Sequence, residues 1–151
     1  MSENELFRLT KTFIEEKYAV REALKELKPG VSLEISLEDR IPTHCYFKNG
    51  KAILEEGTPT NSDIRFLVKS EAVRRLADAP CDNLAETGIE IAREVLAGNI
   101  EIQITGSVKN ILTDGYLSIL RKAGPDFFSF LAQYGLKNIF KVINYIKKMK
   151  S

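Results

Sequence analysis

The dipeptide Asn49-Gly50 constrains the fold of this chain more than any other feature of the sequence. It separates two runs of strand-forming residues, 43–48 and 51–55. Both central residues of a two-residue hairpin turn of this kind need a positive φ, which asparagine and glycine adopt with little strain. The sequence therefore predicts an antiparallel β-hairpin over 43–55.

Three further segments alternate apolar and polar residues, which is the period of a β-strand. They are 31–38, 62–69 and 100–104. Alternate residues of a strand share one face, so each segment presents one face that is mainly apolar. Together with the hairpin, these segments predict a sheet of five strands.

Apolar residues recur at three- and four-residue intervals from Leu6 to Leu27, which predicts one helix that ends at Pro29-Gly30. The same spacing would suit a short coiled coil, but so few turns favour a helix that faces a core. Most of the remaining chain also has a helical period.

Capping residues mark two helices after the fourth strand. Ser70 is predicted to cap the first, and Asn83 to cap a second that ends at Gly98. The last helix is predicted to run from Pro125 towards Lys148. We expect these helices to cover the apolar face of the sheet.

The chain has 151 residues, of which 44% are hydrophobic and 28% charged, and this suits one globular domain. We expect a single α+β domain over 1–151, with a twisted five-stranded sheet, antiparallel or mixed, and helices on one face. The acidic N-terminus lacks the basic start and apolar run of a signal peptide, and no window holds 18 uninterrupted apolar residues. The expected location is the cytoplasm.

Residues suited to catalysis are scarce. His44 is the one histidine, and Cys45 beside it would point to the other side of a strand, so both are expected to be structural. Cys81 is also expected to be a buried thiol, the alternative being a lowered pKa near a helix N-terminus. The sequence has no phosphate-binding glycine motif and no metal-binding cluster. We expect no enzymatic activity, no metal and no cofactor.

Positive charge gathers near the C-terminus. Residues 121–151 hold seven Lys or Arg and one Asp, whereas the rest of the chain has a net charge of −5. Segment 125–151 is predicted to be an amphipathic basic helix that contacts an anionic membrane or a partner protein, or docks on its own acidic domain. An isoelectric point near 7.7 and basic residues that lie on a helix argue against nucleic acid as a partner.

Several motifs follow one another in an order typical of a known family. The turn at Asn49-Gly50 precedes Ser62-Asp63 at the start of a strand, then two helices, then a strand between Gly98 and Gly106 and an apolar helix. Over 6–123 the chain resembles the sterol carrier protein type 2 domain family. The resemblance implies an apolar tunnel between a twisted sheet and its helices, which binds lipids, fatty acyl groups or sterols without a catalytic residue.

We therefore expect the chain to bind or transfer a lipid-like molecule, such as a fatty acid, an acyl group or a sterol-like compound. The alternative is an interaction or accessory module, for example in isoprenoid quinone biosynthesis, that presents its C-terminal helix to a partner protein. On the sheet side, the predicted ligand-binding residues are Ile64, Phe66, Val68, Ile102 and Ile104. On the helix side, they are Leu117, Leu120, Phe127, Phe128 and Leu131.

Overall fold

The computed structural model describes residues 1–80 and 82–149, so the predictions for Cys81 and Lys150 lie outside the described residues. Its centre is a five-stranded sheet with the strand order β3-β2-β1-β4-β5. The strands are β1 (Ser32–Leu37), β2 (Ile41–Lys48), β3 (Lys51–Glu56), β4 (Ser62–Val68) and β5 (Ile100–Ile104). β1 and β4 pair in parallel, and the other neighbours pair antiparallel. The expected α+β domain with a mixed sheet is confirmed.

The hairpin predicted from Asn49-Gly50 joins β2 to β3. Asn49 and Gly50 have φ angles of 53° and 78°, and Lys48 pairs with Lys51 across the turn. Two consecutive positive φ angles are the requirement that favours this dipeptide. The hairpin prediction is confirmed.

A β-bulge interrupts the pairing of β1 with β4. Ser32 pairs with Ser62, but Glu34 pairs with Arg65, so β4 has one extra residue in this interval. A bulge of this kind turns two consecutive side chains towards the same face. Asp63 and Ile64 are accordingly both buried, although strict alternation would place them on opposite faces.

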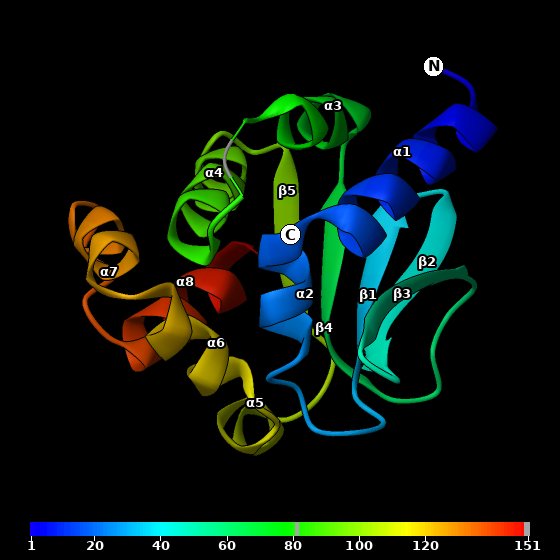
Figure 1. Ribbon diagram of the computed structural model, residues 1–151. Helices are drawn as coiled ribbons and strands as arrows, with labels where there is room; N and C mark the ends of the chain where they lie inside the picture. Colours follow the sequence, from blue (N-terminus) through cyan, green and yellow to red (C-terminus); the bar gives the residue numbers. More distant parts are fainter. Residues whose placement is uncertain (81, 150–151) are drawn as a thin grey trace.

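Helices cover one face of the sheet (Figure 1). They are α1 (Glu3–Glu16), α2 (Tyr18–Leu24), α3 (Ser70–Asp78), α4 (Leu84–Leu96), α5 (Val108–Thr113), α6 (Tyr116–Ala123), α7 (Pro125–Ala132) and α8 (Ile139–Met149). α1 packs on β3, whereas α8 packs on β5 at the opposite edge of the sheet. α4 contacts both α6 and α7. The main apolar core lies between these two layers.

The single helix predicted for Leu6 to Leu27 is wrong, since the chain forms α1 and α2 with a break at Lys17. Lys17 has an extended ψ of 122°. Its ammonium group donates to the carbonyl of Ala79 at 2.9 Å, and the Asp82 carboxylate accepts the backbone N–H of Ala19 at 3.1 Å. Tertiary contacts with the segment before α4 therefore stabilise the break between α1 and α2. The spacing of apolar residues could not predict this break.

The single helix predicted for 125–151 is also wrong, because α7 ends at Ala132 and α8 begins at Ile139. Gly135 has a φ of 78°, and the backbone N–H of Leu136 bonds back to the carbonyl of Leu131 at 3.1 Å. A glycine in the left-handed region with this bonding pattern is a common way for a helix to end. The basic segment is therefore two shorter helices joined by a turn.

Two of the predicted helix termini can be compared with the structure. Asn83 caps α4, and its side chain accepts the backbone N–H of Glu86 at 2.8 Å. Gly98 follows α4 with a φ of 84°, as expected. The cap predicted at Ser70 is wrong: Lys69 occupies the N-cap position, and the carboxylate of Glu38 accepts the Ser70 N–H at 2.8 Å.

Candidate ligand cavity between the sheet and the helices

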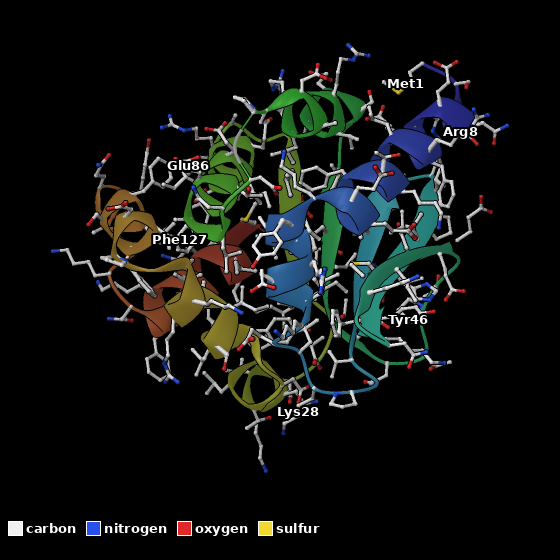
Figure 2. The ribbon with its side chains drawn as sticks, in the orientation of Figure 1. Met1, Arg8, Lys28, Tyr46, Glu86 and Phe127 are labelled. Atoms are coloured by element: carbon white, nitrogen blue, oxygen red, sulfur yellow. The ribbon has the colours of Figure 1, made fainter. Side chains whose placement is uncertain are left out.

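A cavity of about 380 Å³ lies between the inner face of the sheet and the helices. Strands β1, β2, β4 and β5 line it from one side, and helices α1 to α8 contribute residues from the other. Charged side chains such as Arg8 and Lys28 extend outward, away from the space between the layers (Figure 2). A volume of this size lies within the range of sites for small organic ligands, roughly 300–1,000 Å³.

The alternation of the strands explains how the sheet lines this cavity. Ile64, Phe66 and Val68 of β4 all contribute to the lining, and so do Ile102 and Ile104 of β5. Ile64 pairs with Ile104 and Phe66 with Ile102, so the two rows lie side by side. The inner face of the two strands is therefore a continuous aliphatic and aromatic wall.

The lining is uncharged. Among the residues that the structure describes, no Asp, Glu, Lys, Arg or His lines the cavity. Its polar side chains are Thr10, Cys45, Thr87, Tyr116 and Tyr145. The hydroxyl of Thr10 donates to the Leu6 carbonyl at 2.8 Å within α1, so it is directed at its own helix. Such a surface favours an apolar molecule.

Cys45 lies at the boundary of the cavity and is almost fully buried. Burial raises the pKa of its thiol to about 12. A thiol with a raised pKa is protonated near neutral pH and is a poor nucleophile. The prediction of a buried Cys45 is confirmed.

Eight of the ten predicted ligand-binding residues line the cavity, namely Ile64, Phe66, Val68, Ile102, Ile104, Leu120, Phe127 and Leu131. Leu117 and Phe128 are not among the lining residues. Leu117 is half-buried on α6, and Phe128 is 37% exposed on α7. The lining positions are Tyr116, Ile119 and Leu120 on α6 and Phe127 and Leu131 on α7, which recur at three- or four-residue spacing along one face of each helix. Leu117 and Phe128 each follow the first lining residue of their helix by one position and so point away from that face.

Sequence reasoning missed several helical contributors. Ile91 and Val95 of α4 line the cavity, as do Tyr116 of α6 and Ile143 of α8. Their signal was present in the sequence, because Tyr116 precedes Leu120 by four residues and Ile91 precedes Val95 by four. The periodicity identified apolar helix faces but not which of them meet the inner face of the sheet.

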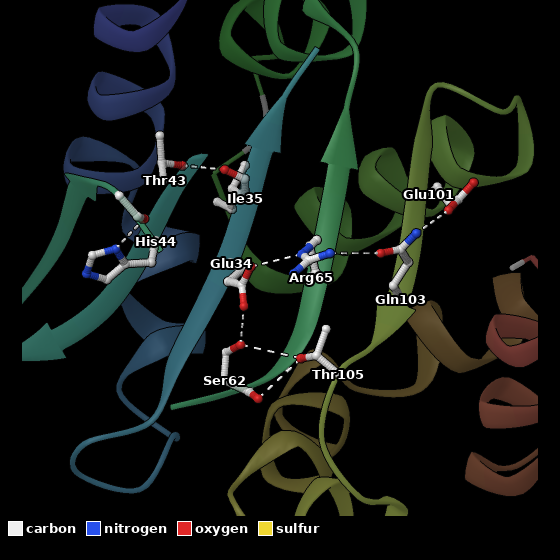
Figure 3. Close-up of polar contacts among 10 residues, drawn as sticks. Glu34, Ile35, Thr43, His44, Ser62, Arg65, Glu101, Gln103 and Thr105 are labelled. Carbon is white, nitrogen blue, oxygen red and sulfur yellow. Dashed lines mark hydrogen bonds and ion pairs between the residues drawn. The ribbon is translucent and has the colours of Figure 1, made fainter. Parts of the chain in front are cut away.

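The opposite face of the sheet is polar (Figure 3). Glu34 accepts from Ser62 at 2.6 Å and from the Arg65 guanidinium at 2.9 Å. Arg65 also donates to Gln103 at 3.4 Å, which continues the row to β5. These bonds tie three strands together on the face away from the helices.

His44 also belongs to this polar face. Its Nδ1 lies 2.9 Å from the Gly57 carbonyl, and its Nε2 lies 3.6 Å from a Glu55 carboxylate oxygen. In the described part of the chain, no three side chains of the His, Cys, Asp or Glu type are grouped as a metal ion would require.

Comparison with known proteins gives a likeness to solved structures. No family model matches the chain, and no curated protein matches it. A solved structure described as "UbiJ-SCP2 Ubiquinone synthesis protein" is similar, with a TM-score of 0.43 and 14% identity over 80% of this chain and 93% of that chain.

Within 1–80 and 82–149, none of the helices has the length and hydropathy needed to cross a bilayer.

Proposed function

We propose that the chain binds a lipid-like hydrophobic molecule in the cavity between β4–β5 and the helices, without chemical conversion of that molecule. The observation that carries this proposal is the uncharged lining of a cavity of about 380 Å³. A filled protein interior has few voids larger than a water molecule. A space of this size with aliphatic and aromatic walls favours an organic ligand, because burial of apolar surface is the main contribution available there.

The experiment is native mass spectrometry of the purified chain, followed by organic extraction and by displacement of bound phenylnaphthylamine, a neutral fluorescent probe. We expect one lipid-like molecule per chain and displacement of the probe by several unrelated lipids. An unoccupied chain that binds neither probe nor any of those lipids would contradict the proposal. It would favour the rival expectation of an interaction module that presents its C-terminal segment to a partner protein.

A second candidate function, contact with an anionic membrane, is favoured by exposed aromatic residues on the C-terminal segment. Tyr134 and Phe140 are 53% and 62% exposed. Lys137 and Lys141 are exposed within the same stretch of chain. Aromatic side chains can enter the interface of a bilayer while lysines contact its head groups, each worth about 1 kcal/mol.

The membrane candidate needs point variants, because α7 and α8 contribute buried residues such as Phe130 and Ile143 and their removal would expose the core. We expect Phe140→Ser combined with Lys141→Glu to reduce co-sedimentation with vesicles that contain phosphatidylserine. Tyr18→Ser is the control, since Tyr18 is 56% exposed on α2. If the double variant and the Tyr18→Ser control both sediment with the vesicles as much as wild type does, the surface around Phe140 and Lys141 does not bind the membrane.

A further inference from the structure

The hydroxyl group of Tyr116 has no hydrogen-bond partner within the described residues, although it is buried. Tyr116 as a whole is only 8% exposed, and it lines the cavity. Nearly all buried polar groups in proteins are hydrogen-bonded, because an unpaired one has lost its contact with water without replacement. An unpaired hydroxyl in the wall of a cavity is therefore a candidate contact for a bound molecule.

A second buried oxygen without a partner lies at the start of β4. Asp63 is 2% exposed, and its Oδ2 has no hydrogen-bond partner among the described residues. The bulge in β4 turns this side chain towards the same face as Ile64, which lines the cavity. Asp63 is not itself a lining residue, so its carboxyl group lies next to the cavity wall and does not form part of it.

The backbone around Asp63 fixes this carboxyl group in place. The carbonyl of Asp63 accepts the N–H groups of Thr105 and Gly106 at 2.8 and 3.1 Å. A Cβ atom at Gly106 would collide with the Asp63 carboxylate and lie 3.0 Å from the Asp63 Cα, so this close approach favours glycine. The start of β4 and the end of β5 thus close around Asp63.

Asp63 and Tyr116 belong to one end of the molecule. This is the end of the sheet where β4 begins, β5 ends, and α5 and α6 lie (Figure 1). Burial raises the pKa of Tyr116, and the negative charges of Asp63 and Asp114 raise it further. The Tyr116 hydroxyl therefore keeps its proton and can donate a hydrogen bond, and Asp63 adds negative charge close to it.

This pair of groups selects among ligand head groups by charge. An ionised carboxylate or phosphate placed here would meet the negative charge of Asp63, and no cationic side chain among the described residues lines the cavity. A neutral hydroxyl group, in contrast, can accept a hydrogen bond from Tyr116 and brings no negative charge close to Asp63. We propose that the Tyr116 end of the cavity binds the hydroxyl group of an apolar alcohol, an inference that rests on the proposed ligand-binding function.

The test uses three probes of one chain length: dodecanol, dodecanoate and dodecane, each titrated against bound phenylnaphthylamine at a pH where dodecanoate is ionised. We expect wild type to bind dodecanol roughly tenfold more tightly than dodecanoate. Tyr116→Phe should weaken dodecanol binding by roughly threefold to tenfold, as for the loss of one hydrogen bond, and leave dodecane unchanged. Tyr145→Phe is the matched control, because Tyr145 lines the cavity but is only half-buried.

Asp63→Asn serves as a second variant of nearly identical shape, and it should reduce the preference for dodecanol over dodecanoate. An unchanged dodecanol affinity in folded Tyr116→Phe, with the probe still bound, would overturn the head-group inference and leave the proposed function intact. Lower thermal stability of Tyr116→Phe without a change in ligand preference would show that a trapped water pairs with the hydroxyl, which also overturns it. Failure of wild type to bind the probe or any of the lipids would overturn both proposals.

Discussion

The two halves of the inner face of the sheet differ in how they are covered. Under α1, Leu54 of β3 is 1% exposed and does not line the cavity. On the other half, Phe66, Ile102 and Ile104 are only half-buried although helices lie over them, and all three line the cavity. The same alternation of apolar residues thus produces a filled core on one side and a hollow on the other.

The arrangement of the helices accounts for this difference. α1 packs directly on β3, so its side chains meet those of the hairpin. On the other half, α8 packs on β5, and α4 packs on α6 and α7 as well as on β5. β4 lies between β1 and β5 in the sheet. Its three inner apolar residues, Ile64, Phe66 and Val68, all line the cavity. Apolar periodicity therefore specifies which face is covered, while the helix arrangement decides whether that face is filled.

The largest expected effect is on the filled half. Leu54→Ala should lower the free energy of unfolding by about 2–5 kcal/mol, because it leaves an unfilled space in a packed core. Urea denaturation measures this change. Ligand affinity should stay unchanged, since Leu54 does not line the cavity. A loss below about 1 kcal/mol would show that the two halves are packed alike.

A smaller loss of stability is expected on the hollow half. Phe66→Ala should cost about 1–3 kcal/mol, less than the 3–5 kcal/mol typical of a fully packed phenylalanine, and should weaken lipid binding about tenfold or more. Leu67→Ala is the control, because Leu67 follows Phe66 on β4 and is absent from the cavity lining. Unchanged stability together with unchanged ligand affinity in Phe66→Ala would show that the assigned face is wrong.

The smallest effect concerns the buried carboxyl group at the end of the hollow half. Burial, together with the nearby Asp114, raises the pKa of Asp63 from 3.8 to about 6. Because the folded state binds this proton more tightly than the unfolded state, the resulting stabilisation is complete below the unfolded pKa and is lost as the pH rises through about 6. Stability should therefore fall by about 1 kcal/mol between pH 5 and pH 8 from this group.

Asp63→Asn removes the titrating group with little change of shape, so this part of the pH dependence should be absent in the variant. Urea denaturation of both proteins at several pH values gives the comparison. Identical slopes of stability against pH for wild type and Asp63→Asn would contradict the raised pKa.

Strands were predictable because their signals are local. Asn49-Gly50 specifies a turn from two residues, and the alternation over β4 and β5 places Phe66 and Ile102 on the inner face without knowledge of the fold. The β4 bulge was not predictable in this way. Asp63 faces inward because of how β4 pairs with β1 and β5. The residues next to Asp63 in the sequence give no sign of this pairing.

Helix boundaries and the cavity depended on contacts between distant segments. The break at Lys17 is held by Ala79 and Asp82, about 60 residues later in the chain. Gly135, by contrast, carried a local signal that was overlooked, since a glycine with helix-favouring residues on both sides often ends a helix. The hollow itself could not be predicted, because Leu54 and Phe66 are both inward apolar residues and differ only in the helix above them.

Amide chemical-shift mapping by nuclear magnetic resonance during titration with dodecanol tests the central claim most directly. Because the ligand should occupy the hollow half, we predict saturable shifts at amides of β4, β5, α4 and α6, with β3 largely unaffected, since none of its residues lines the cavity. Saturable shifts confined to β3, or no shifts with dodecanol or any other lipid tested, would contradict the account.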